Sequence, residues 1–79
     1  MRLKAIRKSK GISQQKMAMD LSVSQNTISR YETGEREPSI ADLIRIADYL
    51  HVSLDYLLER TDNPHFDIYF FTLIKDSNL

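Results

Sequence analysis

Four serines each stand directly before a run of residues with helical periodicity, and this pattern restricts the chain to a series of short helices. They are Ser13, Ser24, Ser39 and Ser53. Serine is a preferred N-cap because its hydroxyl accepts a hydrogen bond from a backbone N–H that the first helical turn leaves unpaired. The two glycines, Gly11 and Gly34, each follow a helix-like run, where the end of the helix favours positive φ. Together these residues predict five helices.

The first helix is expected over about residues 2–10, and each of the others begins after one of the four serines. Apolar residues at i, i+3, i+4 and i+7 mark the inward faces. The expected inward side chains are Leu3 and Ile6; Gln14, Met17, Ala18 and Leu21; Ile40, Leu43, Ile44, Ala47 and Leu50; and Leu54, Leu57 and Leu58. Because the connections are short, we predict a compact all-α fold.

The link between the second and third helices is only about three residues long. So short a turn, from Leu21 to Ser24, forces two helices to cross steeply, as in a helix-turn-helix unit. On the third helix, the outward flank carries Gln25, Asn26, Ser29, Arg30 and Thr33. Amides can bind adenine and a guanidinium can bind guanine, each through two hydrogen bonds. The alternative is an ordinary solvated flank, but such flanks usually carry Glu and Lys.

A carboxylate falls on the inward side of the same helix. Glu32 shares that side with Ile28 and Tyr31, and a buried carboxylate needs a partner. Arg7, next to the inward Ile6, can supply one, so we predict an Arg7–Glu32 ion pair with a structural role. Gln14, in the first turn of the second helix, either binds a DNA phosphate or extends the cap of its own helix.

Residues 2–60 resemble the XRE family, the lambda-repressor-like and Cro-like domains of phage and bacterial regulators. The matching stretches are residues 3–14, 23–34, 38–39 and 52–58. The resemblance implies a five-helix domain that binds double-stranded operator DNA, usually as a two-fold homodimer. It implies base contacts by Gln25, Asn26, Ser29 and Arg30, phosphate contacts by Gln14 and Ser24, and the pairing of Arg7 with Glu32. We expect further phosphate contacts from Ser13, Thr27, Lys10 and Arg36.

The sequence departs from this family at two places. Ser22 stands in the turn where the family usually has glycine, so a positive φ there would be strained. The tail after Pro64 has no counterpart in the minimal family domain, and the family implies nothing about it. We therefore divide the chain into a DNA-binding domain, residues 1–61, and a C-terminal extension, residues 62–79, for dimerisation or partner binding.

The extension contains four aromatic residues within residues 66–71. Asn63 and Pro64 could begin a sixth helix, whereas the β-branched and aromatic content suits a strand. We favour the helix. In either form these rings should pack on the domain or on a second copy of it.

Charge is divided between the two halves of a chain whose net charge is zero. Residues 1–36 hold eight basic and three acidic residues, a net charge of +5, and residues 37–79 carry a net charge of −5. This asymmetry suggests one face for a polyanion, although chance could also divide surface charge in this way.

The remaining features argue against other classes of protein. The chain has no cysteine, two histidines, no glycine-rich phosphate loop and no metal-ligand spacing. We therefore expect no enzyme, cofactor or metal. No apolar stretch reaches the roughly 20 residues of a membrane span, so we expect a cytoplasmic protein. The leading interpretation is a repressor of phage or mobile-element type that binds a palindromic operator. The alternative is an antitoxin whose tail binds a toxin protein.

Overall fold

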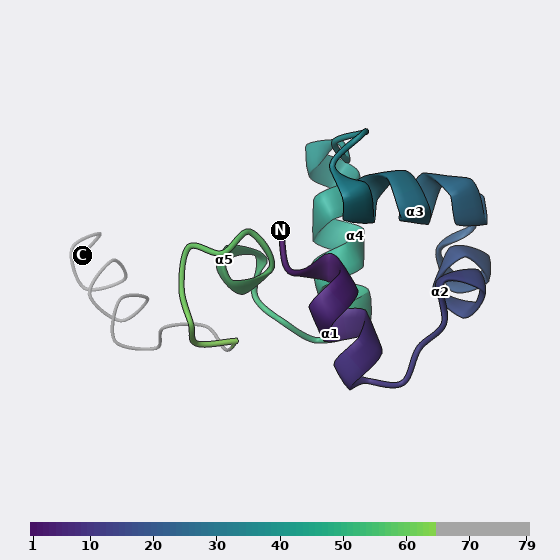
Figure 1. The fold of residues 1–79 in the computed structure, drawn as a ribbon. Helices are drawn as coiled ribbons and strands as arrows, with labels where there is room; N and C mark the ends of the chain where they lie inside the picture. The colour runs from purple at the N-terminus through teal and green to yellow at the C-terminus, as the bar shows by residue number, and fades with distance from the viewer. Residues whose placement is uncertain (65–79) are drawn as a thin grey trace, which may run out of the picture.

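The computed structural model describes residues 1–64, and this part of the chain forms five helices and no strand (Figure 1). They are α1 (Leu3–Ser9), α2 (Gln14–Leu21), α3 (Gln25–Thr33), α4 (Ile40–Leu50) and α5 (Leu54–Leu57). The all-α, five-helix prediction is confirmed. None of these helices is long and apolar enough to cross a membrane. Residues 65–79 of the extension, which contain the aromatic segment for which the sequence favours a helix over a strand, lie outside the described residues.

Serine side chains begin four of the helices. In each case the serine Oγ accepts a hydrogen bond from the backbone N–H three residues later, at 3.0 or 3.1 Å. The capping serines are Ser13, Ser24, Ser39 and Ser53. Each cap satisfies one donor that the helix itself cannot pair, which explains why these positions predict the helix starts closely.

Left-handed residues end several of the helices. Gly11 and Gly34 have φ of 69° and 83°, as expected, and Ser22 and His51 adopt the same region with φ of 58° and 56°. After Ser22, the Val23 N–H donates to Ala18 O at 3.0 Å, a bond typical of a Schellman motif. Ser22 therefore adopts the turn conformation that glycine adopts more easily.

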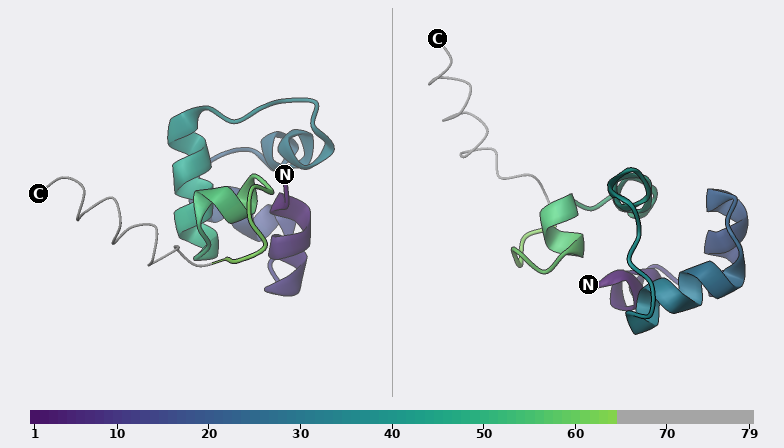
Figure 2. Two further views of the ribbon diagram at one scale, coloured as in Figure 1. Left: turned by 90° about the vertical axis from the view of Figure 1, so that its left-hand side faces the viewer. Right: turned by 90° about the horizontal axis from the view of Figure 1, so that it is seen from above.

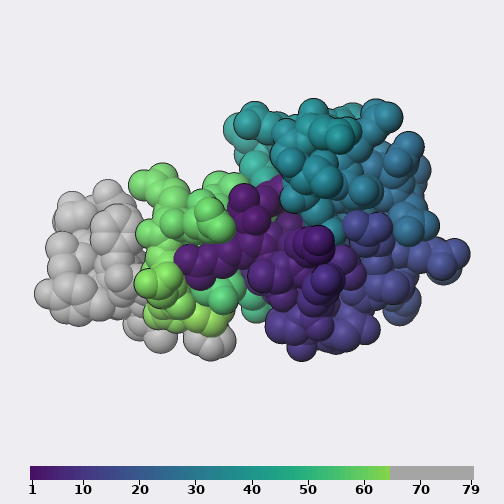
Figure 3. All heavy atoms as spheres, in the orientation of Figure 1, coloured from purple at the N-terminus to yellow at the C-terminus, as the bar shows by residue number. Residues whose placement is uncertain are grey.

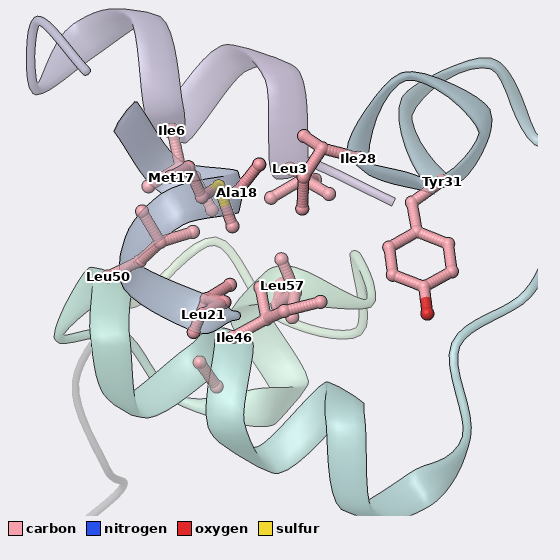
Figure 4. Close-up of a cluster of buried hydrophobic side chains, with 11 residues drawn as sticks. Leu3, Ile6, Met17, Ala18, Leu21, Ile28, Tyr31, Ile46, Leu50 and Leu57 are labelled. Carbon is pink, nitrogen blue, oxygen red and sulfur yellow. The ribbon is translucent and has the colours of Figure 1, made fainter. Parts of the chain in front are cut away.

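One hydrophobic core joins all five helices (Figure 4). Its buried side chains are Leu3 and Ile6 of α1, Met17, Ala18 and Leu21 of α2, Ile28 and Tyr31 of α3, Ile46, Ala47 and Leu50 of α4, and Leu57 of α5. Every helix therefore contributes at least one side chain to the same core.

The inward face of α4 differs from the sequence prediction. Ile40 and Ile44, expected to be buried, are 75% and 47% exposed, whereas Ile46 is buried at 2%. Apolar residues occupy two neighbouring stripes of this helix, and periodicity alone cannot choose between them. Packing selects the stripe of Leu43, Ile46, Ala47 and Leu50. At the end of α5, Leu58 was also expected inward and is 38% exposed.

The arrangement of the helices places α3 at one edge of the domain. Figures 1 and 2 show α2 and α3 crossing steeply, and α3 also packs on α1 while α4 packs on α5. The N-terminus lies next to α5, where the Arg2 N–H donates to Leu57 O at 2.8 Å. This backbone bond connects the beginning and the end of the domain, while α2 and α3 form its opposite side.

Candidate nucleic-acid interface

The inward side of α3 holds this helix in the domain. Ile28 is completely buried and Tyr31 is 5% exposed, so both contribute to the core. The Glu32 side chain is 2% exposed and lies beside α1 and α2. The inward side of α3 thus consists of three side chains at i, i+3 and i+4, namely Ile28, Tyr31 and Glu32. Their burial fixes the rotation of α3 about its own axis, as the helical spacing predicts.

A buried hydrogen-bond network surrounds the Glu32 carboxylate. Arg7 Nε lies 2.6 Å from Glu32 Oε2, and Arg7 Nη2 donates to Oε1 at 3.2 Å, which gives a two-point ion pair. The Arg7 side chain is only 8% exposed, and its Nη1 donates to Ile12 O at 2.7 Å. Gln14 Nε2 adds a third hydrogen bond to Glu32, at 3.0 Å. The Glu32 carboxylate thus connects α1 and α2 to α3, and Arg7 adds the loop after α1 to the same network.

The network also determines the charge state of Glu32. Burial by itself would raise the pKa of this carboxyl, but the hydrogen bonds from Arg7 and Gln14, together with the guanidinium charge, outweigh burial. The pKa of Glu32 therefore lies below its ordinary value of 4.5. Glu32 remains ionised and paired at neutral pH, which a buried carboxylate requires if it is to hold helices together.

The outward side of α3 has a different character. Gln25, Asn26 and Arg30 are exposed and Ser29 is half-buried. Within residues 1–64, the side chains of Gln25, Asn26 and Ser29 make no hydrogen bond. Arg30 has one loose partner, with its Nε 3.9 Å from Glu35 Oε2, and both side chains are more than half exposed. The residues predicted to contact bases therefore form one solvent-facing flank with free donors and acceptors.

The residues predicted to contact phosphate are distributed over several elements. Ser13 and Ser24 are the N-caps of α2 and α3, and Ser24 Oγ shares a hydrogen bond with Thr27 Oγ1 at 2.8 Å. Arg36 is exposed, with its guanidinium 5.9 Å from the centre of the Tyr31 ring. Lys10 follows α1 and lies at a groove shared with α5, and within the described residues it has no polar contact with α3.

The N-terminus of α2 combines two features that suit an anion. Its Gln14 side chain is half-buried and directed to Glu32, so the predicted phosphate ligand also helps to orient α3. One N–H of the Gln14 amide remains available, because an NH₂ group has two donors. The backbone N–H groups at the start of a helix are natural anion ligands.

Sequence reasoning missed a group of polar contacts between α4 and the helix-turn-helix unit. Arg45 Nη2 donates to Leu21 O at 2.5 Å, directly before the turn at Ser22. One turn later on α4, the Tyr49 hydroxyl donates to Asp20 Oδ2. These two residues attach the end of α2 to α4. The only signal in the sequence is their i, i+4 spacing beside the buried stripe, which does not identify partners in another helix.

The Tyr49–Asp20 contact changes the proton affinity of both groups. The hydrogen bond from Tyr49, followed by the one from Lys16, lowers the pKa of Asp20. The same bond to Asp20, together with burial, raises the pKa of Tyr49 to about 12. Both groups therefore remain in their bonded protonation states over the neutral range. In residues 1–64, no cluster of His, Asp and Glu side chains could hold a metal ion.

A comparison of the sequence with models of protein families finds a match. The model of the helix-turn-helix family matches residues 3–57, which run from the start of α1 to the end of α5. The matched range contains both flanks of α3, the buried Arg7–Glu32 pair and the short turn at Ser22. No solved structure matches the chain at a significant level.

Several bacterial and phage regulators are similar over the same region. YqaE, an uncharacterized HTH-type transcriptional regulator of Bacillus subtilis, is 46% identical over 61 residues, which are 77% of this chain and 53% of that protein. YonR, an uncharacterized HTH-type transcriptional regulator of the same organism derived from the SPbeta prophage, is 42% identical over 67 residues, or 85% and 61% of the two chains.

The third relative comes from another bacterium. RstR, the transcriptional repressor of the cryptic phage CTXphi in Vibrio cholerae, is 37% identical over 59 residues, or 75% of this chain and 53% of RstR. The chain therefore spans between half and two thirds of the length of these relatives. The similarity covers the helical domain, and the relatives contain additional sequence beyond it.

Proposed function

Because this chain belongs to the XRE family of helix-turn-helix proteins, we propose that it binds double-stranded DNA sequence-specifically and represses transcription. In this proposal α3 enters the major groove and its outward flank contacts base edges. A groove of this kind admits one α-helix, and each base pair presents a distinct pattern of donors and acceptors in it.

The observation that supports the proposal best is that the outward polar side chains of α3 lack firm partners, whereas the inward Glu32 has them. Gln25 and Asn26 have exposed amides without hydrogen-bond partners in residues 1–64, and Arg30 has only a loose, exposed ion pair. An exposed ion pair is worth about 0–1 kcal/mol. A guanine, with two acceptors in one plane, can therefore replace Glu35 as the partner of Arg30 at little cost.

Phosphate contacts would set the position of α3 in the groove. We assign them to the helix starts at Ser13 and Ser24, to Gln14 and Thr27, and to the cations Lys10 and Arg36. Such contacts fix the orientation of a protein on the duplex but do not identify bases. Gln14 has a special place among them because it also bonds to Glu32, which connects phosphate binding to the orientation of α3.

Two copies would act together on one site. A single α3 can contact only a few base pairs, so a two-fold homodimer on a palindromic operator would give the specificity that a repressor needs. The name of the CTXphi relative, a transcriptional repressor, supports the repression of transcription that we propose for this chain. Half-sites in such a complex lie about 34–36 Å apart, one turn of the duplex.

Selection of binding sites from a random pool of DNA duplexes tests the proposal. We expect a palindromic consensus with half-sites one helical turn apart, and an affinity that falls steeply as salt rises because bound cations are released. The matched control is the Asn26→Ala, Arg30→Ala double variant, which keeps every proposed phosphate ligand and should select no consensus. Enrichment of no sequence by the natural chain would contradict the proposal.

A further inference from the structure

A groove runs along the side of the domain opposite α2 and α3. It has a volume of about 410 Å³ and lies between one face of α1 and the segment around α5. Ala5, Ile6 and Lys10 line it on one side, and Val52, Tyr56 and Pro64 line it on the other. Figure 3 shows these two segments, purple and green, side by side on one face of the molecule. Pockets of roughly 300–1,000 Å³ are large enough to bury organic groups.

The chain itself is fixed at the edge of this groove. Asp62 Oδ1 accepts a hydrogen bond from Arg2 Nη2 at 3.0 Å, and the guanidinium of Arg2 stacks 4.3 Å from the centre of the Tyr56 ring. Two residues later, Pro64 O accepts a hydrogen bond from the Ser53 N–H at 2.8 Å. These contacts hold residues 62–64 against α1 and α5. The aromatic segment therefore starts from a defined position, because Pro64, which precedes it, itself lines the groove.

The sequence directly after Pro64 has the composition that this groove can accept. Phe66 follows by two residues, which limits its distance from Pro64 to about 7 Å. Phe66, Ile68, Tyr69, Phe70 and Phe71 are all apolar or aromatic, and Asp67 is the one acidic residue among them. The groove offers aliphatic groups on Ala5, Ile6 and Val52, an aromatic ring on Tyr56, and the cation of Lys10 at its edge. Rings pack on such surfaces, and a cation suits either a ring face or a carboxylate.

We propose that the aromatic segment, residues 66–73, binds in the groove between α1 and α5 of its own chain. The segment covers apolar surface of the domain and buries rings that would otherwise face water, which stabilises both partners. Residues 62–64 act as the fixed arm that brings the segment to the groove. This docking is independent of whether the outward flank of α3 reads bases.

The full chain, labelled with ¹³C at its methyl groups, tests the docking by nuclear Overhauser effects. We expect contacts from phenylalanine ring protons to the methyl groups of Val52 and Ile6, and none to Met19, which is 69% exposed on α2. The absence of ring contacts to Val52 and Ile6 would overturn the proposal. A mixture of labelled and unlabelled chains separates two cases, since contacts found only between chains would mean that a second copy fills the groove, which also overturns it.

Two matched variants identify the groove as the binding site. Ala5→Glu places a charge in the groove, whereas Ala41→Glu places the same charge at another exposed helical alanine, on α4 and away from the groove. We expect the first to abolish the ring contacts to Val52 and the second to leave them unchanged. Because Ala5→Glu could disturb α1, Phe66→Ala provides a second variant that alters no residue of the domain, and it should also return the Val52 methyl resonance toward its undocked position. Equal behaviour of the two glutamate variants would contradict the assignment.

Discussion

On the inward flank of α3, the Glu32 carboxylate accepts hydrogen bonds from Arg7 and Gln14, whereas on the outward flank the amides of Gln25 and Asn26 bond to nothing within residues 1–64. The two flanks belong to one helix of nine residues. In the same part of the chain, no buried side-chain nitrogen or oxygen lacks a hydrogen-bond partner. The difference teaches that polar groups with partners hold this helix in place, and that those without partners are available to a ligand.

Removal of Glu32 should break the ion pair on the inward flank of α3 and cause the largest loss of stability. Glu32→Ala leaves the Arg7 guanidinium buried without its partner, which should reduce the free energy of unfolding by about 3–5 kcal/mol. Urea denaturation followed by circular dichroism measures the loss. The matched control is Glu35→Ala, since Glu35 is 68% exposed and its removal should change stability by no more than about 0.5 kcal/mol. A similar effect for the two variants would mean that the buried pair does not hold the domain together.

Acid should weaken the same pair without a mutation. Because the folded-state pKa of Glu32 lies below 4.5, its contribution to stability is complete above that pH and is lost as the pH falls through the lowered value. Thermal unfolding between pH 7 and pH 3 should show a steeper decline for the natural chain than for Glu32→Gln. Other carboxylates, such as Asp20, titrate in both proteins, so the difference between them isolates Glu32. Parallel profiles would contradict this account.

Removal of Arg30 should affect the outward flank alone. Arg30→Ala should weaken binding to the selected operator by about 1–3 kcal/mol and relax the preference at one base pair. Its stability should be unchanged, because its side chain is 54% exposed and its ion pair with Glu35 is loose. Fluorescence anisotropy with operator and random duplexes measures both effects. Arg36→Ala, the removal of a proposed phosphate ligand, should instead weaken binding to the two duplexes equally.

A substitution in the turn that precedes α3 should stabilise the domain, and its effect should be smaller than the loss expected for Glu32→Ala. Ser22 has φ of 58°, a conformation that costs a non-glycine residue roughly 1–2 kcal/mol. Ser22→Gly should remove this strain and, after the entropy cost of glycine, stabilise the domain by about 1 kcal/mol. The melting temperature should then rise by roughly 4–8 °C. The reverse change, Gly11→Ser at φ of 69° with open space around the added atom, should lower it. An unchanged or lower melting temperature for Ser22→Gly would show that the turn is not strained.

The comparison of the two flanks also explains what the sequence could predict. Caps and turns are local chemistry, so Ser13, Ser24 and Ser53 indicate the starts of their helices directly. Glu32 is detectable because a charge on an inward position requires a partner. The buried face of α4 was predicted only in part: Ala47 and Leu50 are buried as expected, whereas Ile46 is buried in place of Ile44. The two isoleucines have equal hydrophobicity, and only packing against other helices distinguishes them.

Contacts between distant helices were beyond sequence reasoning for a related reason. Arg45 bonds to the Leu21 carbonyl across 24 residues, and Tyr49 bonds to Asp20 across 29. From the sequence alone, Arg45 and Tyr49 could each be a solvent-exposed residue of α4 with no partner in another helix. Their partners become apparent only when α2 is placed against α4, which depends on the whole core and on no local pattern.

The most direct test of the outward flank removes an acceptor from the DNA instead of a donor from the protein. Each guanine of the selected operator is replaced in turn by 7-deazaguanine, which lacks the N7 acceptor, and binding of the natural chain and of Arg30→Ala is measured. We predict that one replacement per half-site weakens binding of the natural chain and has no further effect on Arg30→Ala. Equal losses for both proteins at every guanine, or no loss for either, would contradict base recognition by Arg30.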